Sequence, residues 1–116
     1  MKRFESTNFV GITQKIGEKS LFTERQLEII LRKLNKLEVE LKMSRGSYYR
    51  QVGQAREKLV SFCYTLILLR SLEILSKDDI VVISKVADQI SVVEGEVGVD
   101  DIVGVVDEMI HRICKL

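Results

Sequence analysis

One stretch of the sequence, residues 44–75, constrains the fold of this chain more than any other. It opens with Ser44, a residue type favoured at helix N-caps because its hydroxyl can accept a hydrogen bond from a free amide of the first turn. Apolar or small residues then recur at alternating steps of four and three, at positions 48, 52, 55, 59, 62, 66 and 69. This period is helical. The stretch therefore predicts one long helix, or two nearly continuous ones.

The two halves of this helix differ in chemistry. The first half is basic and aromatic, whereas the second half, Leu59–Leu69, contains no charged residue. We expect the charge-free half, with Leu66 among its buried side chains, to form the core around which the chain is built. In the first half, the same apolar seam predicts that Tyr48, Val52 and Ala55 face inward.

Helix-start signals frame the rest of the chain. Thr23 with Gln26 three residues later has the spacing of a capping box, and it begins a helical apolar pattern that continues to Lys42. Ser76 with Asp79 has the same spacing, although the β-branched run at 80–83 leaves a strand open there. Gly95 and Gly98 indicate a loop over 91–99, and a last helix is expected over about 100–115.

These patterns predict an all-α chain of about five helices with a helix-turn-helix-like or αα-hairpin core. With 116 residues, the chain is long enough for one domain, which we place at residues 21–116. Residues 1–20 are interpreted as an N-terminal arm, first as a tail that packs a few side chains on the core. The alternatives are an extended arm, a pair of short strands or a flexible segment.

Composition narrows the functional classes. Apolar residues make up 46% and charged residues 30%, and the net charge is only +1, so attraction to a polyanion has to come from a local patch. No apolar segment resembles a signal peptide or reaches the roughly 20 residues of a membrane span, so we expect a cytoplasmic protein without a membrane role. Cys63 and Cys114 lie in apolar runs and are expected to be buried, reduced thiols, with a disulfide as the alternative. Abundant Ile, Val, Leu, Lys and Glu is typical of a thermophile.

Catalytic and metal-binding patterns are weak in this sequence. His111 with Cys114 could supply two ligands on one helical face, but zinc requires three or four. The acidic pairs at 78–79 and 100–101 are what helix N-termini attract through the helix dipole. We therefore expect no enzyme activity, no metal, no cofactor and no small-molecule substrate.

The basic half of the long helix is the candidate functional site. A helix that presents its N-terminal turns to DNA uses Arg and Lys against phosphates, and Arg, Gln and Tyr toward base edges. The side chains left outside the inward seam are Arg45, Tyr49, Arg50, Gln54 and Arg56. The same residues could instead form a solvated basic helix face.

The motifs S-R-G-S at 44–47 and A-R-E-K-L at 55–59 resemble the two ends of the recognition helix in region-4-type helix-turn-helix domains of bacterial sigma factors. F-T-E-R-Q at 22–26 resembles the start of the same module. The resemblance covers residues 22–59, although the interval between the motifs is several residues shorter than in that module. It implies DNA contact through Arg45, Ser47, Tyr49, Arg50 and Gln54.

The sequence thus predicts a small DNA-binding protein, regulator-like or chromosome-associated, that forms a homodimer. The alternative is a helical protein–protein interaction or assembly module, whose apolar seams at 27–41 and 48–69 serve oligomerisation. An exposed basic face with groove-compatible spacing across a two-fold axis would favour DNA. A face that is buried or paired with acids would favour assembly.

Overall fold

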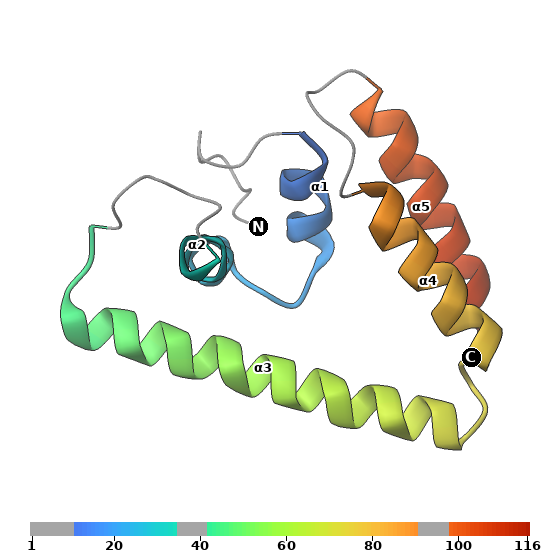
Figure 1. Ribbon diagram of the computed structural model, residues 1–116, viewed down its shortest axis with the longest axis horizontal. Coiled ribbons are helices and arrows are strands. Elements are labelled where there is room, and N and C mark those ends of the chain that lie inside the picture. The colour runs from blue at the N-terminus through green and yellow to red at the C-terminus, as the bar shows by residue number, and fades with distance from the viewer. Residues whose placement is uncertain (1–10, 35–41, 91–97) are drawn as a thin grey trace.

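The computed structural model describes residues 11–34, 42–90 and 98–116, and all regular structure in these ranges is helical. The helices are α1 (Gly11–Lys19), α2 (Glu24–Lys33), α3 (Arg45–Ser71), α4 (Lys77–Ile90) and α5 (Val99–Ile113). The prediction of an all-α chain with about five helices is confirmed. Figure 1 shows α2, seen end-on, above the first half of α3, while α4 and α5 stand at the other end of the molecule.

Three of the helices begin with the capping chemistry that the sequence indicated. Thr23 and Gln26 form a reciprocal capping box at α2. Ser44 accepts a hydrogen bond from the Ser47 amide at α3, with an Oγ–N distance of 3.1 Å. At α4, the Ser76 amide donates to Asp79 Oδ2 at 2.8 Å and the Asp79 amide donates to Ser76 Oγ at 3.0 Å. Since each cap satisfies amides that the first turn leaves free, these helix starts are locally encoded.

Helix boundaries differ from the prediction in two places. Within the segment interpreted as an N-terminal arm, residues 11–19 form α1, and residues 1–10 lie outside the described part of the chain. The helix expected over 23–42 ends at Lys33 with Leu34 as its C-cap, and residues 35–41 also lie outside the described part. Residues 80–83 are helical, so the strand alternative there is wrong. Of the expected loop, Gly98 has a left-handed φ of 75° that glycine adopts at little cost.

The core does not lie where the sequence placed it. Its cluster of buried apolar residues consists of Ile12 from α1 with Val99 and Val103 from α5. Ion pairs join the same two helices, with a distance of 3.6 Å between Lys19 Nζ and Asp107 Oδ1. The helix α1, in the segment expected to be an N-terminal arm, is therefore a component of the core.

The charge-free half of α3 is largely exposed, and the prediction that it forms the core is wrong for this chain. Ala55 is the one buried residue of α3, and Leu66 is only half-buried. The reason is length. With a rise of ~1.5 Å per residue, the 10 residues of α2 cover about 15 Å, whereas the 27 residues of α3 extend about 40 Å. Cys63 and Cys114, expected to be buried, are both exposed.

Candidate nucleic-acid interface on α3

The first three turns of α3 present the predicted site residues to solvent. Arg45, Arg50, Gln54 and Arg56 are exposed, as is Tyr49, whose exposed fraction is 64%. The sixth predicted residue, Ser47, is half-buried and contributes its backbone amide to the Ser44 cap. The structure therefore brings five of the six predicted side chains onto the solvent side of one helix.

These residues fall into two rows on that helix. Because successive residues of an α-helix are about 100° apart, Arg45, Tyr49 and Arg56 lie within about 40° of one another around the axis. Arg50 lies in a second row, and Gly53 falls between the two rows. A Cβ added at Gly53 would meet no atom within 4 Å, so the space above the helix backbone is open there. We call Arg45, Tyr49, Arg50, Gly53 and Arg56 the arginine face.

The arginine face is electrostatically uncompensated. Arg45, Arg50 and Arg56 form no ion pair with any residue that the structure describes. Glu57, the one acidic residue between Arg45 and Lys58, is exposed on the same side of the helix as Arg50 but about two turns further along it. Three arginines against one glutamate leave the local surface positive, although the whole chain has a net charge of only +1.

A buried glutamine fixes the position of the arginine face relative to α2. Gln26 is 2% exposed, and its Oε1 accepts from the Thr23 amide at 3.1 Å and from Lys58 Nζ at 2.7 Å. Its Nε2 lies 3.4 Å from both Gln51 Oε1 and Gln54 Oε1. All four hydrogen-bonding positions of this side chain are thus used, as a buried amide requires.

This network separates the basic residues of α3 by role. Lys58 also donates to the Leu21 carbonyl oxygen at 2.8 Å, so its ammonium group is engaged in holding α3 against the start of α2. Gln54 shares this positioning role while its side chain stays exposed. Sequence reasoning identified Gln26 as a capping residue, but not as the partner of α3. The capping-box spacing carries no information about the far helix.

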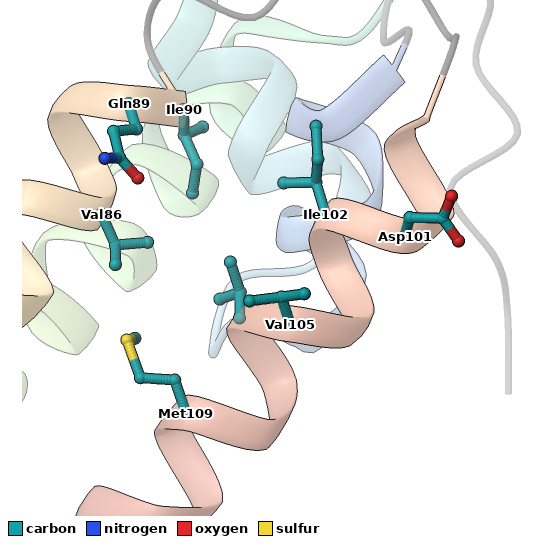
Figure 2. Close-up of a pocket in the computed structure, with 8 residues that line it drawn as sticks. Val86, Gln89, Ile90, Asp101, Ile102, Val105 and Met109 are labelled. Carbon is teal, nitrogen blue, oxygen red and sulfur yellow. The ribbon is translucent and has the colours of Figure 1, made fainter.

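An apolar groove lies between α4 and α5, far from the arginine face along the chain. Its volume is about 410 Å³. Figure 2 shows Val86, Val105 and Met109 pointing into the space between the two helices, whereas Asp101 lies on the side of α5 away from α4. A groove lined in this way offers few polar groups that could orient a polar ligand, and it suits apolar side chains.

The other candidates from the sequence have local structural roles. His111 Nδ1 lies 2.8 Å from the Asp107 carbonyl oxygen, within its own helix, and Cys114 follows the end of α5. Within the described ranges, no three His, Cys, Asp or Glu side chains gather as a metal site would require. Among the helices of these ranges, none combines the length and the apolar character that crossing a membrane demands.

Comparison with known proteins adds no relative: no family model, no curated protein and no solved structure matches this chain. The interpretation of the site therefore depends on its geometry and charge.

Proposed function

We propose that this protein binds DNA through the arginine face of α3. The observation that carries the proposal is that three exposed arginines, free of ion pairs among the described residues, surround an open glycine position in the first turns of an N-capped helix. The helix N-terminus adds the positive end of the helix dipole to their charge. The resemblance of residues 22–59 to sigma-factor region-4-type domains supports the proposal, because it implies DNA contact through Arg45, Tyr49 and Arg50 of this face.

The contacts in this proposal are mainly to phosphates. Arginine guanidinium groups form charge-assisted, often bidentate hydrogen bonds with phosphate oxygens. Tyr49 and Gln54 are the side chains placed to reach sugar or base edges, but Gln54 is already hydrogen-bonded to Gln26. We therefore expect weak sequence preference and an affinity that depends strongly on salt. Three phosphate contacts correspond to a slope of about −2.7 in a plot of log K against log salt concentration.

The test exchanges attraction for repulsion at two positions. In the double variant Arg50→Glu, Arg56→Glu, we expect the affinity for a DNA duplex at about 50 mM salt to fall at least about tenfold. The slope of log K against log salt concentration should become about two units less negative. Neither side chain is hydrogen-bonded to another described residue, so helical circular dichroism should be unchanged.

The matched control is Lys77→Glu, Lys85→Glu on α4. Both lysines are exposed and form no ion pair with a described residue, and the change in net charge is the same. We expect this variant to keep most of the wild-type affinity. Absence of DNA binding by the wild type at low salt, or equal losses in the two double variants, would contradict the proposal. The assembly-module interpretation would then take its place, supported by the exposed second half of α3.

A further inference from the structure

The second half of α3 is an uncovered apolar surface. We define the α3 apolar surface as the exposed residues Leu59, Val60, Phe62, Cys63, Tyr64, Ile67 and Leu68. Among them Tyr64 is 72% exposed, Ile67 66% and Leu68 55%. Figure 1 shows this half of α3 continuing past α2 toward the end where α4 begins. Contiguous apolar patches of this kind on a folded chain mark interaction sites.

The most exposed residues of this surface form a seam on the side of α3 that faces away from α2. Ile29 and Ile30 of α2 lie across a shared groove from Val52, Ala55 and Leu59 of α3. Val60, Tyr64 and Ile67 follow one another at steps of four and three, and at about 100° per residue they lie about 120–180° around the helix axis from Ala55. A spacing that averages 3.5 residues is the pattern with which one helix packs along another. This seam therefore suits a second helix packed along the side of α3 that α2 does not cover.

We propose that a second copy of this chain covers the α3 apolar surface, with its own α3 packed antiparallel across a two-fold axis. A two-fold axis places the same surface on both sides. Because this surface contains no charged residue, self-association buries no unpaired charge. The Thr65 hydroxyl already donates to the Ser61 carbonyl oxygen at 2.8 Å, so its polar atom is satisfied before association.

The antiparallel direction follows from the basic half of the helix. A parallel pair would bring the two sets of Arg45, Arg50 and Arg56 together, and like charges repel. In an antiparallel pair centred between Cys63 and Tyr64, these arginines lie at opposite ends. Val60 of one copy then faces Ile67 of the other.

This inference does not depend on DNA binding. From the rise of ~1.5 Å per residue, the two Arg50 positions of such a dimer lie about 40 Å apart along the helix pair. Successive major grooves on one side of DNA are about 34 Å apart. The dimer does not match that spacing, which agrees with phosphate contacts rather than paired groove reading.

The experiment compares Ile67→Glu with Leu21→Glu by sedimentation equilibrium on the full chain at micromolar concentration. The two side chains are equally exposed, at 66% and 65%, but Leu21 precedes α2 and lies outside the α3 apolar surface. We expect wild type and Leu21→Glu to be dimers. Ile67→Glu should raise the dissociation constant of the dimer at least about a hundredfold, because it places a carboxylate on each side of an apolar interface.

The two cysteines report the interface without disturbing it. Both are exposed in the single chain, but only Cys63 belongs to the α3 apolar surface. Maleimide labelling of Cys63 should slow at least tenfold as the protein concentration rises, while that of Cys114 stays constant. A monomeric wild type, assemblies larger than dimers, equal labelling of the two thiols at all concentrations, or a dimer that Ile67→Glu leaves unchanged would overturn the proposal.

Discussion

Replacing Gln26 by Met tests whether the buried amide holds the basic half of α3 against α2. Methionine is also unbranched and of similar length, so the substitution fills the same space while removing the polar atoms. It deletes the acceptor of the Thr23 amide and of Lys58, at 3.1 and 2.7 Å, and the donor to Gln51 and Gln54. The local helix propensity hardly changes.

The expected loss of stability is about 2–4 kcal/mol. A hydrogen bond to a charged group contributes about 1.5–3 kcal/mol and one between neutral groups about 0.5–1.5 kcal/mol. These values apply to the bonds from Lys58 and from the Thr23 amide. The contacts at 3.4 Å to the two glutamines are long and should contribute little. Lys58 is left with the Leu21 carbonyl oxygen as its acceptor and regains water at its exposed end.

Urea denaturation followed by far-ultraviolet circular dichroism measures this loss. Wild type and variant must be compared at one protein concentration, since the apparent stability of a dimer depends on concentration. Gln89→Met on α4 is the control, because Gln89 is exposed and makes no hydrogen bond to another described residue. It should change the free energy of unfolding by less than about 0.5 kcal/mol. An equally small effect at Gln26 would refute the reasoning.

Two further predictions concern the helices that form the core. Ile12→Ala should cost about 2–4 kcal/mol in urea denaturation, because Ile12 is 4% exposed between α1 and α5, whereas the 42% exposed Ile110 should lose far less on the same change. Ser76→Ala should cost about 1 kcal/mol by removing the hydroxyl that caps α4. A cost near zero at Ile12 would mean that α1 is not part of the core, and one near zero at Ser76 would mean that Asp79 alone starts the helix.

The sequence predicted those features that depend on neighbours along the chain. The caps at Thr23, Ser44 and Ser76 each involve residues three positions apart, so their chemistry is visible in a short window. The side of α3 that faces solvent could also be predicted, because Ala55 marks the inward direction of the helix and Arg50 therefore points outward. For the same reason five of the six candidate site residues were placed correctly as exposed side chains.

Features that depend on distant segments were not predicted. The apolar character of Leu59–Leu69 predicts burial, but it does not identify the segment that would cover this half of α3. The expectation that it forms the core is therefore wrong, because α2 ends before reaching it. The helix α1 was missed because Gly11 and Gly17 interrupt a short segment that Val99 and Val103 stabilise from the far end of the sequence. Helices of this length depend on tertiary packing more than on propensity.

The two proposals meet in one measurable quantity, the salt dependence of DNA binding. A dimer that places both arginine faces on one duplex contacts about six phosphates, so its salt slope should approach −5.4, against about −2.7 for a single face. Ile67→Glu leaves Arg45, Arg50 and Arg56 unchanged but separates the copies, and it should therefore halve the slope while each face keeps its own affinity. Fluorescence anisotropy with a labelled duplex over a series of salt concentrations would measure this. If Ile67→Glu produced monomers whose salt slope equalled that of the wild type, the two arginine faces would act independently on DNA. The dimer would then not place both faces on the same duplex.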